Sequence, residues 1–199
     1  MRLKQWLAVL KNFAGRGTCP HELSSTLDLP IRRLILTPEE LAERLHLAAT
    51  SRVLEVGCGP GYFSVEVARR VPQGRLELFD VQREMVAKAR RKLDRAGVVH
   101  AGYTQGDART LPFADGCFDV AFLVTVLGEV PDPAACLRGL HRLLRPGGWL
   151  SITEQPGDPD YQPLPVVRAL AEQQGFTFVE TYRRRWRHFT ANFAKPGKS

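Results

Sequence analysis

Residues 52–64, RVLEVGCGPGYFS, decide the fold of this chain. Residues 53–56 are an apolar, partly β-branched run, which is typical of a strand buried on both faces. Three glycines follow at alternate positions, Gly57, Gly59 and Gly61, and apolar residues at helical spacing begin at Phe63. Glycine has no Cβ atom, so it adopts positive φ and leaves room for a ligand. The stretch therefore predicts a strand, a glycine turn and a helix whose N-terminus faces a bound molecule.

The spacing of the glycines separates two kinds of ligand. A dinucleotide site carries the pattern G-x-G-x-x-G, and its third glycine, counted from Gly57, would fall where Tyr62 stands. The observed run, E-x-G-x-G-x-G from Glu55, resembles motif I of the class I S-adenosylmethionine-dependent methyltransferases. A glycine turn that serves only the packing of strand and helix is the alternative.

The resemblance implies an α/β fold, with a Rossmann-like, doubly wound, mostly parallel seven-stranded sheet. N-terminal helices would precede this sheet, and an antiparallel C-terminal hairpin strand would end it. The cofactor would be S-adenosyl-L-methionine, and the product S-adenosyl-L-homocysteine. In the family the glycine turn lies against the methionine part of the cofactor, and the acidic residue, here Glu55, helps to hold its amino group.

Two further acidic residues fall at the ends of expected strands. A second strand over residues 75–79 ends at Asp80, at about the interval from the glycine turn expected between the first two strands of a βαβ unit. A carboxylate there can accept hydrogen bonds from two ribose hydroxyls, and a cap on the next helix, residues 82–96, is a compatible alternative. After a third strand over residues 98–104, Gly106-Asp107-Ala108 resembles the third signature of the family, which implies that Asp107 accepts from the adenine amino group. A simple turn is the alternative. The other residues that the resemblance places against the cofactor are Cys58, Val81, Ala108 and Val124.

The second half of the chain continues the resemblance. Residues 111–119, LPFADGCFD, with the apolar strand 118–124, resemble the ubiquinone and menaquinone biosynthesis group, or methyltransferase type 11. Residues 144–148, LRPGG, resemble the helix stop of the family before a fifth strand over residues 149–154. Residues 176–182 and 186–193 alternate around an arginine turn and predict a terminal β-hairpin.

Methyl transfer requires that a nucleophile be aligned with the bond to the sulfonium and that water be excluded. A general base is needed only where the acceptor is protonated at neutral pH. Candidates at the strand ends are Glu129, Glu154, Asp158 and Tyr161, and a surface or capping role is the alternative for either glutamate. The leading hypothesis is a methyltransferase that acts on a small-molecule acceptor by direct in-line displacement. Alternatives are a lipid or quinone methyltransferase at the membrane surface, a non-catalytic cofactor-binding module, and an RNA methyltransferase.

Composition sets broader limits. The 199 residues, 44% hydrophobic and 25% charged, suit one domain with a sizeable core. The net charge of +7 comes with no RNP, zinc-finger or KH signature, so no specific nucleic-acid partner is expected. The four cysteines form no C-x-x-C pair, which favours reduced thiols in a cytoplasmic protein and no metal site. The oligomeric state stays open.

The N-terminal segment, residues 1–37, is expected to precede a methyltransferase domain over residues 38–199, whose first helix is expected over residues 38–47. Residues 2–13 predict a short amphipathic helix. This helix could serve as a lid, as a weak membrane-surface contact or as a helix packed on the core. The chain has no apolar run long enough to span a bilayer. The longest apolar run of its basic N-terminus, Leu7 to Leu10, is too short for a signal peptide, and no cleavage site follows it.

Overall fold

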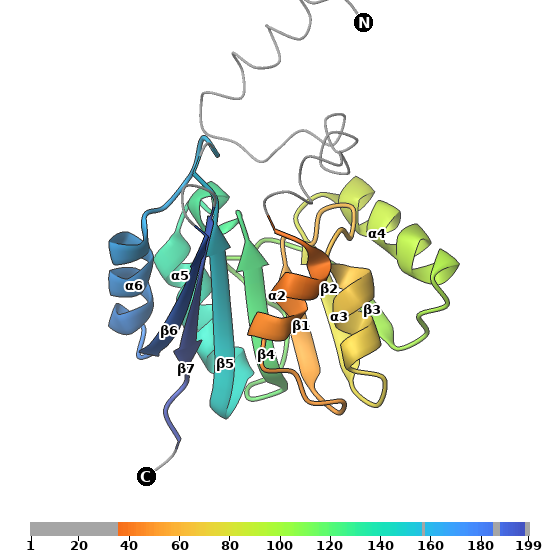
Figure 1. The fold of residues 1–199 in the computed structure, drawn as a ribbon, viewed down its shortest axis with the longest axis horizontal. Helices are drawn as coiled ribbons and strands as arrows, with labels where there is room; N and C mark the ends of the chain where they lie inside the picture. Colours follow the sequence, from red (N-terminus) through yellow and green to blue (C-terminus); the bar gives the residue numbers. More distant parts are fainter. Residues whose placement is uncertain (1–35, 157, 185–187, 198–199) are drawn as a thin grey trace, which may run out of the picture.

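The computed structural model describes residues 36–156, 158–184 and 188–197, and Figure 1 shows their arrangement. The helix expected over residues 2–13 lies outside the described residues, so the division of the chain at residue 37 stays a prediction. In chain order the elements are α2 (Pro38–Arg44), β1 (Arg52–Val56), α3 (Ser64–Arg70), β2 (Arg75–Asp80), α4 (Arg83–Arg95), β3 (Ala101–Gln105), β4 (Phe118–Val124), the 3₁₀ helix η3 (Leu127–Glu129), α5 (Pro133–Leu143), β5 (Leu144–Glu154), α6 (Leu164–Gln173), β6 (Thr177–Arg184) and β7 (His188–Ala194).

One seven-stranded sheet organises these elements, with strand order β3-β2-β1-β4-β5-β7-β6. The first five strands of this order pair in parallel, and β7 is antiparallel to both β5 and β6. The expected α/β fold with a mostly parallel sheet and an antiparallel C-terminal strand is therefore confirmed. The order reverses between β1 and β4, which is the switch point where open parallel sheets bind ligands.

Helices cover both faces of the sheet, as Figure 1 shows. On one face α2, α3 and α4 pack against a cluster that includes Val53 and Leu76. On the other face α5 and α6 pack against a cluster that includes Leu54, Val56 and Ala121. Alternate residues of β1 thus enter different cores, which explains why this strand is an apolar run rather than an alternating pattern. None of the helices in the described ranges has the length and apolarity needed to cross a bilayer.

Polar contacts join α2 to the C-terminal hairpin. The Arg44 guanidinium donates to Oγ1 of Thr190 and to Nε2 of His188, both at 2.9 Å. The amide of Asn192 donates to the Arg44 carbonyl at 2.7 Å. His188, Thr190 and Asn192 are buried, so these bonds satisfy polar groups that water does not reach. The first and last described elements of the domain are therefore fixed to each other.

Three boundaries differ from those expected from the sequence. The first helix, expected over residues 38–47, ends at Arg44, because His46 takes a left-handed φ of 50°. The third strand begins at Ala101 rather than at residue 98. Gly97 has a φ of 74°, and the Val98 amide donates back to Leu93, so residues 97–98 complete a Schellman C-cap.

The fifth strand begins at Leu144 rather than at residue 149. Leu144 pairs with Phe118, and the register between β4 and β5 then shifts before Val120 pairs with Trp149. The Gly147 amide donates to the Lys195 carbonyl at 2.9 Å, and the Lys195 amide donates to the Gly148 carbonyl at 2.8 Å. Cross-strand bonds thus hold the LRPGG stretch as an irregular strand.

Replacement of Arg44 by alanine should destabilise the protein. The change leaves buried hydroxyl and imidazole groups without their charged donor, which costs about 2–3 kcal/mol. Chemical denaturation should show the loss as a lower midpoint. Arg138→Ala, an exposed position on α5, serves as the control and should change the stability by less than about 0.5 kcal/mol. Equal midpoints for the two variants would show that the Arg44 side chain does not help to hold α2 in place.

Candidate functional site

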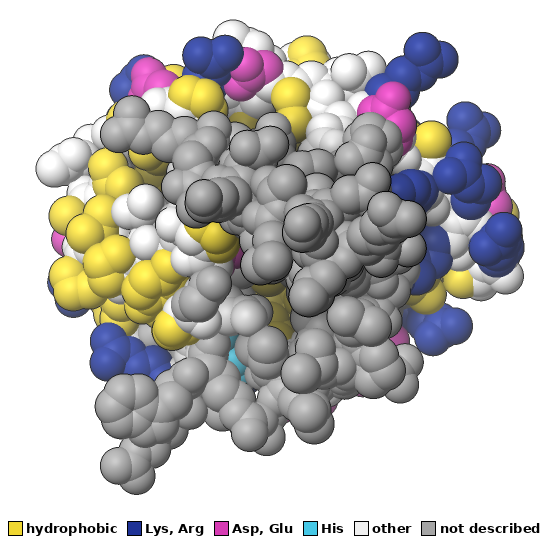
Figure 2. All heavy atoms as spheres, turned by 90° about the horizontal axis from the view of Figure 1, so that it is seen from above, with side chains coloured by type: hydrophobic (Ala, Val, Ile, Leu, Met, Phe, Trp, Pro, Cys, Tyr) yellow, Lys and Arg dark blue, Asp and Glu magenta, His cyan; other side chains and the backbone are white. Residues whose placement is uncertain are grey.

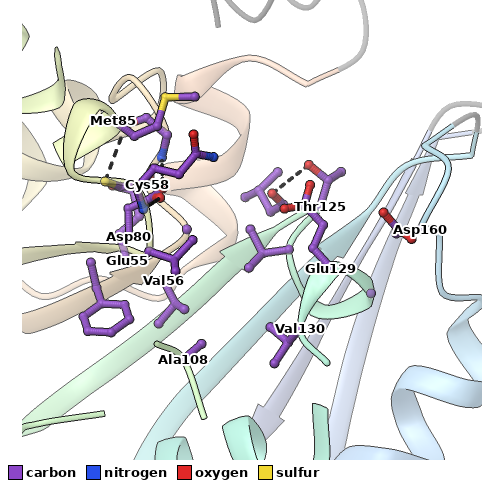
Figure 3. Close-up of a pocket in the computed structure, with 18 of the residues that line it drawn as sticks. Glu55, Val56, Cys58, Asp80, Met85, Ala108, Thr125, Glu129, Val130 and Asp160 are labelled. Carbon is purple, nitrogen blue, oxygen red and sulfur yellow. Dashed lines mark hydrogen bonds between the residues drawn. The ribbon is translucent and has the colours of Figure 1, made fainter. Parts of the chain in front are cut away.

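A cavity of about 910 Å³ lies at the carboxyl ends of the parallel strands. Five parts of the chain contribute its described lining residues: 55–60, 62 and 63; 79–82 and 85; 106–108; 124–126 and 128–131; and 155, 158–160 and 162. Figure 3 shows Glu55, Cys58 and Asp80 on one side of this space and Thr125, Glu129 and Asp160 on the other. The cavity therefore reaches from the glycine turn, across the switch point, to the segment that follows β5.

All three glycines of the turn have positive φ, but they differ in how much space a Cβ atom would find. Gly57, with φ of 71°, packs so closely that a Cβ atom would lie 2.3 Å from a methyl carbon of Val126. Gly61, with φ of 79°, faces Ala89 of α4, and a Cβ atom there would lie 3.2 Å from the Ala89 backbone. Gly59, with φ of 52°, has no atom within 4 Å of such a Cβ position. Gly57 and Gly59 line the cavity, whereas Gly61 serves the packing of α4.

Asp80 is fixed at the end of β2 by two backbone amides. Its Oδ2 accepts from Gly59 and its Oδ1 accepts from Gln82, both at 2.9 Å. The side chain is buried in the cavity wall, and burial raises the pKa of its carboxyl above the ordinary value. Each oxygen retains a lone pair for a second donor. Asp80 does not cap the following helix, because Gln82 is the N-cap residue of α4 and no side chain caps that helix. The bond from the Gln82 amide instead makes Asp80 an Asx turn before the helix, so the same carboxylate can hold the turn and a ligand.

Glu55 lies on β1 at the base of the cavity, where it is almost fully buried. Ser64 donates to its Oε2 at 2.5 Å. Burial raises the pKa of Glu55 to about 8, against the lowering effect of the Ser64 bond, and the nearby Asp80 charge raises it further. The protonated form therefore dominates at neutral pH, and a cationic group beside it would favour the ionised form.

The remaining residues expected at the cofactor are brought to the same cavity. Cys58, Val81, Ala108 and Val124 all line it. Asp107 also lines the cavity, but both of its carboxyl oxygens accept hydrogen bonds from Arg109. These bonds lower the pKa of Asp107 and occupy part of its accepting capacity. An adenine amino group would therefore share this carboxylate with Arg109.

The four candidate catalytic residues have different positions. Glu129 lines the cavity from η3, and Asp158 lines it from the segment after β5. Glu154 and Tyr161 are not among the lining residues. The Tyr161 ring packs edge-on against Phe189, with centroids 6.3 Å apart, beside the apolar cluster of α5 and α6. Glu154 ends β5 behind the wall and is 1% exposed.

The environment of Glu154 is unusual for a carboxyl group. Its Oε2 accepts from the Gln162 amide at 3.4 Å, and its Oε1 has no hydrogen-bond partner within the described part of the chain. Burial raises the pKa of Glu154 to about 8, and the charges of Asp158, Glu129 and Asp160 act in the same direction.

Several lining residues are not among the candidates named from the sequence, and two of them affect the chemistry of the cavity. Asp160 follows the candidate Asp158 in the segment after β5 and contributes a second carboxylate to the same wall. Thr125 directly follows β4 with a φ of 54°, a conformation that a β-branched residue rarely adopts. The Thr125 amide donates to the Thr153 carbonyl at 2.8 Å, and its hydroxyl donates to the Val124 carbonyl. Residue type gives no signal for such a backbone angle, whereas the acidic segment is visible in the sequence.

The two buried glutamates should make stability depend on pH. Each carboxyl titrates near 4.5 when the chain is unfolded and near 8 when it is folded, so the folded state binds more protons between these values. Their contribution to the free energy of unfolding is therefore fully present below pH 4.5 and is lost as the pH rises to about 8. Each group loses up to about 1.4 kcal/mol per pH unit over this range.

Urea denaturation at several pH values between 5 and 8 gives the free energy of unfolding at each pH. This free energy should fall less steeply with rising pH for Glu154→Gln and for Glu55→Gln than for the native chain. Asp94→Asn, an exposed position at the end of α4, is the control and should leave the slope unchanged. Parallel slopes in all four proteins would contradict the assignment of raised pKa values to these two carboxyls.

The chain matches known methyltransferases in sequence. A methyltransferase domain family matches residues 53–148. The ubiquinone/menaquinone biosynthesis C-methyltransferase of Pasteurella multocida is 37% identical over 105 residues, which cover 52% of this chain and 39% of that protein. A demethylmenaquinone methyltransferase of Listeria welshimeri is 31% identical over 127 residues, with 62% and 54% covered. The chain spans about a third to just over half of the length of the curated relatives it matches.

The fold agrees with this match. A SAM-dependent methyltransferase from Aquifex aeolicus superposes with a TM-score of 0.84, at 22% sequence identity, and the alignment covers 89% of this chain and 100% of that one. The glycine turn, Asp80 and Glu55 lie at one cavity. The methyltransferase domain match and the structural neighbour imply S-adenosylmethionine as the cofactor. The chain therefore resembles the class I S-adenosylmethionine-dependent methyltransferases, and within them the ubiquinone and menaquinone biosynthesis group.

Proposed function

We propose that this protein methylates a small-molecule acceptor that enters the part of the cavity beside Glu129 and residues 155–162. One observation supports the proposal above the others. A single cavity holds both the glycine turn with its fixed carboxylate Asp80 and a further space walled by different elements. A cofactor at the turn and an acceptor in the second space would thus meet within one enclosure.

The residues of the first space fit the cofactor. Gly59 leaves its side open, so a ligand can lie directly against the backbone. Asp80 offers two carboxylate oxygens that backbone amides already orient. Glu55 provides a buried carboxyl group that would gain its negative charge beside an ammonium group. When bound, the cofactor supplies a methyl group on a sulfonium, which leaves as a neutral thioether after in-line attack.

The contribution of the protein is then alignment and exclusion of water. Val126 packs against Gly57 and also lines the cavity. Its side chain therefore helps to position the glycine turn relative to the second space. Among the candidate catalytic residues, we assign contact with the acceptor to Glu129, because it lines the cavity. Glu154 does not line the cavity and would act on the acceptor only indirectly. Tyr161 would pack against the apolar cluster of α5 and α6. The described cysteines are free thiols, which supports a reducing compartment such as the cytoplasm.

Replacement of Asp80 by asparagine tests the cofactor site. The variant keeps the size of the side chain but loses the charge that would bind adjacent hydroxyl groups. Calorimetric titration should show that S-adenosylmethionine binds at least about tenfold more weakly than to the native chain. Asp94→Asn should leave the affinity unchanged. Absence of binding to the native protein itself would refute the proposed function.

A second variant tests the open face of the turn. Gly59→Asn should fold, because asparagine tolerates positive φ and no atom lies within 4 Å of its Cβ position. The new side chain would project into the space beside the glycine turn, and we expect the affinity for S-adenosylmethionine to fall more than about tenfold. A thermal midpoint near that of the native protein would separate this loss from unfolding. Unchanged affinity would show that the cofactor does not approach this residue.

A further inference from the structure

Ser64, the first residue of α3, has a buried hydroxyl group that does not cap the helix. Serine is a favoured N-cap residue, but the N-cap position of α3 is occupied by Phe63, and no side chain caps this helix. Ser64 is 0% exposed, and its hydroxyl donates to Oε2 of Glu55 at 2.5 Å. The bond joins α3 to β1, so the hydroxyl serves the carboxyl group of Glu55 rather than the helix.

Gly61, the third glycine of the turn, makes room for this bond. A Cβ atom at Gly61 would lie 3.4 Å from Oγ of Ser64 and 3.2 Å from the Ala89 backbone. Gly61 is not among the described lining residues of the cavity. This glycine therefore serves the close packing of the turn against α3 and α4 rather than contact with a ligand.

Glu55 and Ser64 differ in their access to the cavity. Glu55 lines the cavity, whereas Ser64 is not among its described lining residues. A ligand in the cavity can thus contact the carboxyl group while Ser64 holds it from within the protein. An ionised carboxyl group accepts about four hydrogen bonds, so the bond from Ser64 leaves capacity for a donor on the ligand.

Charged and titratable groups act on Glu55 from several elements. Burial has the largest effect and raises the pKa of Glu55 to about 8, whereas the bond from Ser64 lowers it. Asp80 at the end of β2 raises this pKa, and Lys92 of α4 lowers it. Cys58 in the turn is a thiol whose own pKa is raised well above its ordinary value by burial and then by the Glu55 charge. The residues paired with Glu55 in the neighbouring strands are the uncharged Leu78 and Phe122.

Other cations of α4 lie on the surface. Figure 2 shows Lys and Arg side chains gathered on the side of α4, where Arg83, Arg90, Arg91 and Arg95 are exposed. Water and salt screen such exposed charges, so they do not replace a cation bound beside a buried carboxyl group. In the empty cavity Glu55 is therefore mainly protonated at pH 7, and a bound cation favours its ionised form.

We propose that Ser64 is a positioning residue of the cofactor site, and that Glu55 releases its proton to the solvent when the ammonium group of the cofactor binds beside it. This inference rests on the proposed function, because it requires that the amino-acid part of the cofactor lies at Glu55. The O–H bond of the carboxyl group breaks, the buffer takes the proton, and the carboxylate stays paired with the ammonium group. The affinity for the cofactor should therefore rise with pH until Glu55 is ionised in the empty site as well.

Two ligands that differ in the amino-acid part test the proton release. S-adenosylhomocysteine carries the ammonium group and no sulfonium, and 5′-methylthioadenosine lacks the whole amino-acid part. Calorimetry of the full chain at pH 7, in buffers of different ionisation enthalpy, should show that the first ligand releases about one proton more than the second. Asp80 also has a raised pKa, but its expected partner, the ribose, is present in both ligands. Equal proton release with the two ligands would overturn the inference.

The pH dependence of the affinity gives a second readout. Between about pH 6 and 7.5 the affinity for S-adenosylhomocysteine should rise by up to about tenfold per pH unit relative to that for 5′-methylthioadenosine, because one more proton leaves on binding. Glu55→Gln should remove this difference between the ligands, and Asp94→Asn should keep it. A ratio of the two affinities that does not change with pH in the native chain would contradict the proton release.

Ser64→Ala tests the positioning role. The loss of a hydrogen bond to a carboxylate should weaken the binding of S-adenosylhomocysteine at pH 7 about tenfold or more, whereas the affinity for 5′-methylthioadenosine should change less than about twofold. The rise of the affinity with pH should extend to higher pH, because the bond that lowers the pKa of Glu55 is gone.

Ser64→Thr keeps a hydroxyl group and should retain most of the affinity, and thermal midpoints show that each variant is folded. An equal loss for the two ligands in Ser64→Ala would show that Ser64 only supports packing, and would overturn its positioning role.

The titrations of the native chain separate this inference from the proposed function. If S-adenosylhomocysteine binds with a heat that does not depend on the buffer, the cofactor site stands and the proton release is wrong. If neither ligand binds, the proposed function fails, and the inference fails with it.

Discussion

The site depends on the bonds that tie the glycine turn to the end of β2. The Gly57 and Cys58 amides both donate to the Phe79 carbonyl, at 2.8 and 3.1 Å, and the Gly59 amide donates to the Asp80 carboxylate. Three consecutive amides of the turn thus bond to two consecutive residues at the end of β2, Phe79 and Asp80. The turn therefore cannot shift without moving Asp80, and the two features that would contact a cofactor keep one fixed geometry.

A ligand can reach the backbone of this turn only because other elements leave it uncovered. Gly57 is packed under Val126 and Gly61 is packed under α4, so the open space beside Gly59 is what remains between two closely fitted neighbours. Positive φ at all three glycines bends the chain away from the strand direction. The glycine residues, their positive φ and the packing around them therefore have the same result: the backbone of the turn is exposed to a ligand.

Much of this arrangement could be predicted from the sequence, and the failures have physical causes. The mostly parallel sheet with its antiparallel C-terminal strand follows from the family resemblance, and the positions of Glu55 and Asp80 follow from glycine spacing and the end of a strand. The delayed start of the third strand after the C-cap at Gly97 and the irregular strand at Gly147 were missed because hydrogen bonds to distant or local backbone, rather than residue type, decide them. Tyr161 lies near the expected edge of the sheet, but its ring joins the apolar cluster instead of the cavity. The left-handed backbone of Thr125 is set by its bond to β5 and leaves no trace in the sequence.

The contacts between α2 and β7 also bear on how the domain assembles. Arg44 bonds to Thr190, 146 residues later, and Asn192 bonds back to the Arg44 carbonyl across 148 residues. Contacts of such sequence separation close very long loops and form late in folding. On the ribosome, the parallel strands can begin to pair while α2 still lacks its polar partners. The domain is completed only when the last strand has left the exit tunnel and inserted between β5 and β6.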